Sequence, residues 1–184
     1  MIQLVGPGGV GKTTIGSALA QRLALRFVDL DAEFAARYGN ISVYLDGHGY
    51  ETYAERNVGL YSDLVRGPNR PDIVALSSGF MTYRDDIHPA YRAWRQRIAS
   101  SPLTFVLLPS LEVYVCSAET VRRQLGRPFA RSAEREEHVI RARFPIYLRL
   151  PARKVETMKP MDMVVTELVT ALADIARCHA QPAS

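Results

Sequence analysis

The sequence predicts an α/β fold of three layers, in which a five-stranded parallel sheet is flanked by helices. Three observations predict it. An apolar run over residues 2–5 leads through a glycine-rich turn into a helical pattern, which is how an α/β unit opens. Four more short runs typical of strands alternate with helical patterns farther along the chain. The chain has 184 residues, 47% of them hydrophobic, and this suits a single domain, 1–184, with a buried core.

Each expected strand is a short run of apolar or strand-forming residues that ends at a turn or at polar residues. The run over 103–108 is the most apolar, and Ser77-Ser78-Gly79 ends the run before it. The expected strands cover residues 2–5, 27–28, 73–76, 103–108 and 154–156.

The expected helices follow these strands, and the first one places Ile15, Leu19 and Leu23 on one face. Gly39-Asn40 ends the second helix, and Gly47 with Gly49 breaks the stretch after it. The segment over 126–136 is rich in arginine and contains proline, so it is expected to be a mobile loop. The expected helices cover residues 12–25, 32–38, 50–65, 90–99, 109–125, 136–148 and 161–177.

Composition and charge narrow the classes of function. The formal net charge is +4, and nearly all of the basic residues are arginine. No long basic run alternates with aromatic residues, and the arginines over 84–97 are typical of a solvated helix, so we expect no nucleic-acid partner. No apolar run is long enough to cross a membrane, and the N-terminus does not resemble a signal peptide. Cys116 and Cys178 show no disulfide or zinc pattern, so we expect a cytoplasmic protein.

The segment over 6–13, GPGGVGKT, matches the phosphate-binding pattern G-x-x-x-x-G-K-[ST] in full. Glycines let backbone N–H groups turn inward around phosphate oxygens, and the following helix adds the positive end of its dipole. Lys12 would reach the outer phosphates, and the Thr13 hydroxyl would bind Mg²⁺. The pattern therefore predicts binding of a nucleoside triphosphate such as ATP. The candidate nucleotide-binding residues are Gly6, Gly8, Gly9, Val10, Gly11, Lys12, Thr13 and Thr14.

Two carboxylates, Asp29 and Asp31, follow the second expected strand. If the extended geometry persists, alternation points both to the same side, at the carboxyl ends of the strands. One would be suited to hold Mg²⁺, and the other to accept a proton from an alcohol. A structural alternative is that they are solvated acids that cap the helix beginning near residue 32, a role open to Asp31.

These residues, taken together, resemble those of the shikimate kinases. The glycine-rich loop, Asp29-Leu30-Asp31, Ser77-Ser78-Gly79, Arg127-Pro128 and Arg143-x-Pro145-x-Tyr147 occur in the order seen in that family. The likeness extends over residues 1–177. The loop alone is common to many kinases and NTPases, whereas its combination with the paired aspartates and the Arg-Pro segment is far more specific.

The resemblance implies a role for each of these residues. Asp29 would help to hold Mg²⁺, and Asp31 would bind acceptor hydroxyls and act as the base. Arg127, in a lid over 126–136, would cover the nucleotide phosphates and neutralise charge in the transition state. Arg143 would bind the carboxylate of the acceptor, with Gly79 beside it, and residues 32–66 would form the acceptor-binding excursion.

Two departures from the family pattern fall on the acceptor side. The family has three glycines after the third strand, and Gly79-Phe80-Met81 is expected to replace them with bulky side chains. The family also has an arginine after an aromatic residue in the helix that follows Gly49, where this chain has Ala54 after Tyr53. Arg56 is the candidate replacement. Three tyrosines, at positions 44, 50 and 53, suit either the acceptor pocket or ordinary packing.

The sequence therefore predicts a kinase that uses ATP and Mg²⁺ to phosphorylate a hydroxyl of a small acid or polyol, with shikimate the first candidate. Two alternatives remain: a kinase for another acceptor, such as gluconate or a cyclitol, and a nucleotide-binding regulatory module without turnover. We expect a monomer or weak dimer whose partner is the small-molecule acceptor.

Overall fold

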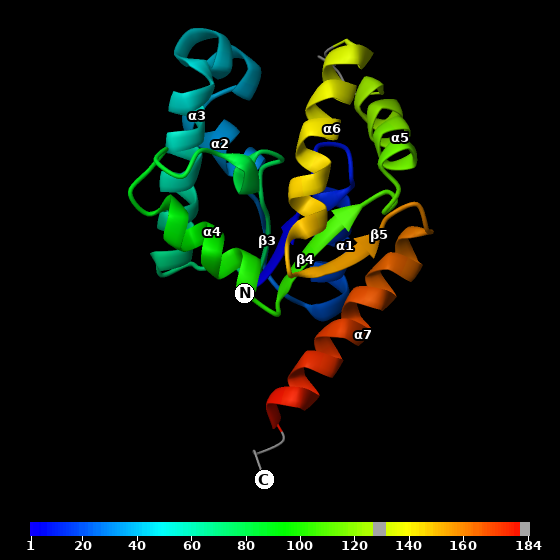
Figure 1. Cartoon of the computed structure of the whole chain (residues 1–184). Coiled ribbons are helices and arrows are strands. Elements are labelled where there is room, and N and C mark those ends of the chain that lie inside the picture. The colour runs from blue at the N-terminus through cyan, green and yellow to red at the C-terminus, as the bar shows by residue number, and fades with distance from the viewer. Residues whose placement is uncertain (127–131, 181–184) are drawn as a thin grey trace.

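The computed structural model describes residues 1–126 and 132–180 and contains one parallel sheet between two layers of helices (Figure 1). The strands lie side by side in the order β2-β3-β1-β4-β5, and all four pairings are parallel. Their bounds are β1 Ile2–Val5, β2 Phe27–Asp29, β3 Ile73–Ala75, β4 Thr104–Leu108 and β5 Arg153–Glu156. The predicted three-layer α/β fold with five parallel strands is thus confirmed.

The helices of the described residues alternate with these strands. The predicted order of helices is present, with one added turn of 3₁₀-helix, η1, after β3. Their bounds are α1 Lys12–Leu23, α2 Leu30–Tyr38, α3 Ile41–Arg66, η1 Phe80–Thr82, α4 Tyr91–Ser100, α5 Val113–Leu125, α6 Ala133–Arg149 and α7 Met161–Ala180.

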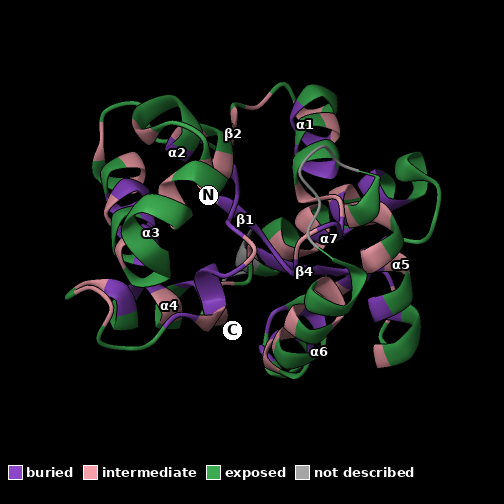
Figure 2. Ribbon diagram, turned by 90° about the horizontal axis from the view of Figure 1, so that it is seen from above, coloured by how far each residue is buried: buried purple, intermediate pink, exposed green. Residues whose placement is uncertain are grey.

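The sheet has a separate hydrophobic core on each face, because successive side chains of a strand point to opposite sides. On one face Leu4 and Phe105 pack with α1 and α7. On the other face Val5 and Val106 pack with residues of α3, α4 and α6. Figure 2 shows the buried strands at the centre with exposed helix faces around them. Burial on both faces explains why the three central strands, β1, β3 and β4, are mostly apolar runs that lack alternation.

Among the helices that begin earlier than predicted, α3 and α6 do so because polar side chains cap them. Asn40 accepts hydrogen bonds from the backbone N–H groups of residues 42 and 43, so α3 starts at Ile41. The break predicted near Gly49 survives as a kink, since Gly49 has φ 80° within α3. Ser132 likewise accepts from the N–H of Arg135, and α6 starts at Ala133, inside the segment predicted as a lid.

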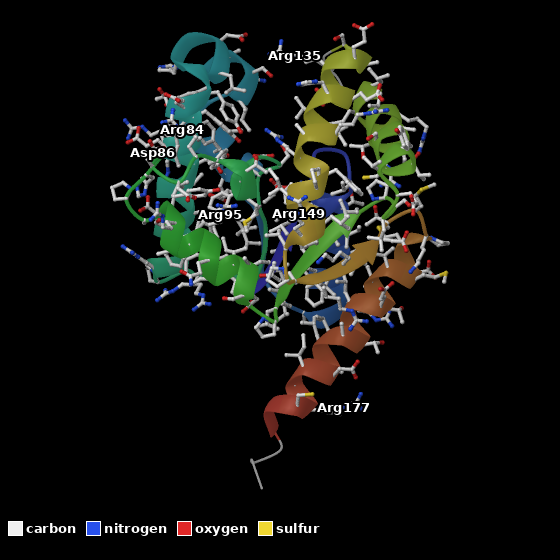
Figure 3. The ribbon with its side chains drawn as sticks, viewed as in Figure 1. Arg84, Asp86, Arg95, Arg135, Arg149 and Arg177 are labelled. Atoms are coloured by element: carbon white, nitrogen blue, oxygen red, sulfur yellow. The ribbon has the colours of Figure 1, made fainter. Side chains whose placement is uncertain are left out.

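The surface arginines over 84–97 pair largely with acids of their own neighbourhood. Arg84 contacts Asp86 and Glu51, and Arg95 contacts Asp85. Figure 3 shows Arg84 beside Asp86, whereas Arg149 and Arg177 lie on other parts of the molecule. Within the described residues, no helix combines the length and apolar character needed to cross a bilayer.

Candidate active site

The glycine-rich loop joins β1 to α1 at the carboxyl edge of the sheet, beside the ends of β3 and β4. Gly6 has φ 149°, and a Cβ added there would lie 2.3 Å from the carbonyl oxygen of Leu107, so the position requires glycine. Lys12 Nζ donates to the carbonyl oxygens of Gly6 and Pro7, each at 2.8 Å. The loop is therefore a compact turn that holds the lysine ammonium against its own backbone.

Asp29 joins the start of α2 to the loop. Its Oδ1 accepts from the N–H groups of Asp31, at 2.9 Å, and Ala32, at 3.2 Å, so Asp29 is the N-cap of the helix. Its Oδ2 accepts from the Thr13 hydroxyl at 2.5 Å. The cap orients the carboxylate, and the two oxygens predicted to hold Mg²⁺ lie together. Hydroxyl and carboxylate oxygens are the hard donors that suit this ion.

Asp31 reaches the site by a different route from the one predicted. The strand ends at Asp29, and Asp31 lies in the first turn of α2, so strand alternation does not relate the two acids. Asp31 is also not the helix cap, because Asp29 takes that position. Its Oδ1 accepts from the hydroxyls of Ser77, at 2.5 Å, and Tyr53, at 3.2 Å.

Arg143 of α6 lies over the turn that follows β3. One of its terminal nitrogens donates to Ser78 Oγ and the other to Tyr50 Oη, each at 3.2 Å. Tyr147, one turn farther along α6, donates to the Ser78 carbonyl oxygen at 2.8 Å. A Cβ at Gly79 would lie 2.6 Å from Tyr50 Oη and 3.1 Å from Arg143, so glycine leaves room for both side chains.

A cavity of about 540 Å³ joins these groups, a volume within the usual range for small-molecule sites. It lies between the loop, α2 and α3 on one side and α5 and α6 on the other. Its lining includes Pro7, Gly8, Asp31, Ile41, Leu45, Asp46, Tyr50, Tyr53, Ser78, Gly79, Gln124, Arg135, Glu136, Ile140 and Arg143.

A second cavity, of about 260 Å³, lies on the other side of the loop and borders Gly9, Gly11 and Thr14. Arg123 lines this cavity, and hydrogen bonds fix the position of its side chain. Its guanidinium donates to Glu119 at 2.6 Å and to the Thr157 carbonyl oxygen at 3.0 Å. The result is a planar cation fixed at the edge of a pocket beside the phosphate-binding loop.

Several expectations for the acceptor side need correction. Phe80 and Met81 have no exposed surface, because η1 turns them into the core below the site, and neither narrows the cavity. Arg56 is exposed and does not line the cavity, since its position on α3 faces solvent. Ala54 is only 1% exposed and belongs to the same core. Arg127 lies outside the described residues.

Other residues of the site were missed or left open by sequence reasoning. Tyr50 and Tyr53 line the cavity, whereas Tyr44 packs edge-on against Phe34. Ser77 and Ser78 occur in the motif that pointed to the family, but nothing in the sequence pairs Ser77 with Asp31. Arg123 carried no signal beyond its position in an amphipathic helix.

The strand order, the loop after β1 and the acids at the carboxyl edge define a P-loop kinase of the small-molecule type, an enzyme that uses ATP. The comparisons with known proteins agree. A family model described as shikimate kinase matches residues 8–173. The chain belongs to the shikimate kinase family.

Individual relatives show the extent of the match. The shikimate kinase of Pseudomonas syringae pathovar tomato is 30% identical over 94% of this chain and 95% of its own length. The structure of shikimate kinase from Acinetobacter baumannii in complex with shikimate has a TM-score of 0.73 and 22% identity, over 98% of this chain and 94% of that one. A gluconokinase from Sinorhizobium meliloti shares the fold at a TM-score of 0.58 and 16% identity, with 96% and 93% covered.

Proposed function

We propose that this protein uses Mg²⁺ and ATP to phosphorylate a hydroxyl group of shikimate. One observation carries the proposal. A carboxylate, Asp31, and a guanidinium, Arg143, line a single cavity whose wall is completed by residues 7 and 8 of the phosphate-binding loop. A ring acid with hydroxyl groups could meet both charges there while its hydroxyl faces the nucleotide.

The donor side is supported by the geometry of the loop and of its neighbours. The backbone N–H groups of the loop and the start of α1 would bind the phosphates, and Lys12 would exchange its carbonyl partners for phosphate oxygens. Thr13 and Asp29 would hold Mg²⁺, which supplies positive charge near the terminal phosphates. The cavity beside Arg123 has the position and the planar cation needed to stack with the base of the nucleotide.

The proposed binding of an acid with hydroxyl groups is supported by two opposite charges, those of Asp31 and Arg143, which line the same cavity. Asp31 would accept the proton of the acceptor's reacting hydroxyl while the oxygen of that hydroxyl attacks the terminal phosphorus of ATP. Arg143 would bind the carboxylate of the acceptor, and the hydroxyls of Tyr50 and Ser78 that hold Arg143 lie close enough to share that contact.

A second candidate acceptor is another hydroxy acid or polyol, such as gluconate. The burial of Ala54 favours it, because the position of the second family arginine contributes no charge to the cavity. The loss of one charge-assisted contact to a carboxylate would weaken binding by about 1.5–3 kcal/mol, or roughly tenfold to a hundredfold.

An ADP-release assay with the purified protein, ATP and Mg²⁺ tests the proposal across shikimate, quinate, gluconate and myo-inositol. We expect the largest kcat/KM with shikimate. Arg143→Ala should raise the KM for shikimate by about tenfold to a hundredfold while the KM for ATP stays unchanged. A larger kcat/KM for gluconate would favour the second candidate. No stimulation by any acceptor would contradict both.

A further inference from the structure

A chain of buried polar side chains runs from the core to Asp31. The Tyr83 hydroxyl donates to Asn57 Oδ1 at 3.2 Å, Asn57 Nδ2 donates to Ser77 Oγ at 2.9 Å, and Ser77 Oγ donates to Asp31 Oδ1 at 2.5 Å. Asn57 has no exposed surface, Ser77 is 2% exposed and Tyr83 is 5% exposed. The chain joins α3, the end of β3 and the segment after η1 to the carboxylate on α2.

Each hydrogen bond in this series is donated in the direction of Asp31. Burial raises the pKa of Tyr83 well above its ordinary value, so Tyr83 keeps its proton and can donate it to Asn57. With its oxygen thus occupied, the Asn57 amide presents N–H to Ser77. A serine hydroxyl has one proton, and Ser77 therefore directs that proton to Asp31.

A second donor reaches the same oxygen. Tyr53 Oη lies 3.2 Å from Asp31 Oδ1, and its pKa is raised by burial and by the charge of Asp31, so it too remains a donor. Among the described residues, all hydrogen bonds given to the Asp31 side chain converge on Oδ1. Because Asp31 lines the acceptor cavity, Oδ2 is the oxygen left to meet an acceptor.

We propose that Ser77, Asn57 and Tyr83 are positioning residues for phosphoryl transfer, which hold Asp31 through Oδ1 so that Oδ2 accepts the acceptor's proton. The inference rests on the proposed function. In the step, the O–H bond of the acceptor breaks and its proton moves to Oδ2. The electron pair left on the acceptor's oxygen forms the new bond to the terminal phosphorus, and the bond from that phosphorus to the bridging oxygen of ATP breaks to release ADP.

The expected effect is on the rate of the chemical step, because a carboxylate that rotates away from the attacking hydroxyl loses its alignment. Ser77→Ala should lower kcat about tenfold to a hundredfold. Tyr83→Phe, which removes one hydroxyl of a residue that does not line the cavity, should lower kcat about threefold to tenfold. Both should leave the KM for ATP within about twofold of the wild type.

Two further variants separate positioning from packing. Ser77→Thr keeps the hydroxyl and should restore most of the kcat that Ser77→Ala loses. The double variant S77A/Y83F should be no slower than S77A within about twofold, because both changes act through one hydrogen bond.

Ser62→Ala is the matched control. Ser62 is a buried serine of α3 whose Oγ donates to Val58 at 2.9 Å and accepts from Trp94 at 2.8 Å, away from the cavity. Its loss should reduce thermal stability about as much as Ser77→Ala does and leave kcat unchanged.

The measurements are steady-state ADP release with saturating ATP and varied shikimate, together with thermal unfolding of each variant. Three outcomes would each overturn the positioning role, provided that the wild type phosphorylates an acceptor. They are a wild-type kcat in Ser77→Ala, additive losses of kcat in the double variant, and an equal loss of kcat in Ser62→Ala. A wild type without acceptor-stimulated turnover would instead overturn the proposed function and this inference with it.

Discussion

The two sides of the cavity are built in different ways. The phosphate-binding loop of the donor side is one continuous segment, residues 6–13, formed by its backbone geometry and a single lysine. The acceptor side gathers side chains from α2, α3, the turn after β3 and α6. A backbone site tolerates change in neighbouring side chains, whereas a side-chain site can be altered one residue at a time. Loss of the one lysine on the donor side should therefore have a larger effect than any single change among the acceptor side chains.

The largest effect is expected on the donor side, from Lys12→Ala. The ammonium that now bonds to Gly6 and Pro7 would no longer neutralise charge on the transferred group, and kcat should fall about 10²–10³-fold. ADP release measures this, and thermal unfolding should change little. Lys154→Ala, which removes a half-buried lysine on β5, is the control and should keep full activity. Activity of Lys12→Ala within tenfold of the wild type would contradict the proposed role.

A smaller effect is expected on the acceptor side, from Gly79→Ala. The added Cβ would lie 2.6 Å from Tyr50 Oη and push it and Arg143 into the cavity, so the KM for shikimate should rise about tenfold with the KM for ATP unchanged.

Gly59→Ala is the matched control for that change. Among the described residues, apart from the backbone of its own helix, nothing lies within 4 Å of a Cβ at Gly59. This variant should keep its kinetics and gain about 0.5–1 kcal/mol of stability from helix propensity. Equal kinetics for the two variants would show that Gly79 is not part of the acceptor pocket.

The smallest effect is expected at Glu119, which holds Arg123 beside the second cavity. Hydrogen bonds from Arg122 and then Arg123, against the opposing effect of burial, lower the pKa of Glu119 to about 2. A lowered folded-state pKa stabilises the protein above the unfolded-state value, and this contribution is lost as pH falls toward 2. Glu119→Gln should therefore reduce the free energy of unfolding by about 1 kcal/mol at pH 7, and by less below pH 4.

The same variant should raise the KM for ATP by about twofold to fivefold and leave the KM for shikimate unchanged, because Arg123 lies on the donor side of the site. Denaturant unfolding at pH 7 and pH 3.5 provides the stability measurement. Glu137→Gln, which breaks an exposed pair with Arg141 on α6, is the control and should change neither KM. A loss of stability that grows as pH falls would contradict the sign of the effect.

The same contrast explains what could be predicted from sequence. The strands and helices followed from apolar runs and their spacing, because burial on both faces of a parallel sheet leaves a strong pattern. Thr13 was assigned to Mg²⁺ from the loop motif, and Asp29 from its place after the second strand and from the family resemblance. Ser77 was not found as the partner of Asp31, nor Asn57 as the partner of Ser77, because these contacts join residues 46 and 20 positions apart.

The errors on the acceptor side have a related cause. Phe80 and Met81 were expected in the cavity because they stand where the family has glycines. One turn of 3₁₀-helix rotates both side chains into the core, and the residue types there do not predict that turn. Arg56 lies two residues after Ala54 and therefore on a different face of α3, and that face is exposed to solvent and does not reach the site.

The burial of Ala54 limits how this protein can change its acceptor preference over evolutionary time. Ala54 belongs to the same buried cluster as the aromatic rings of Tyr53, Phe80 and Tyr83. An arginine there would bury a charge among those rings and cost stability before it gained any contact with an acceptor. A basic group at this position would therefore require a second substitution that first opens space in the core.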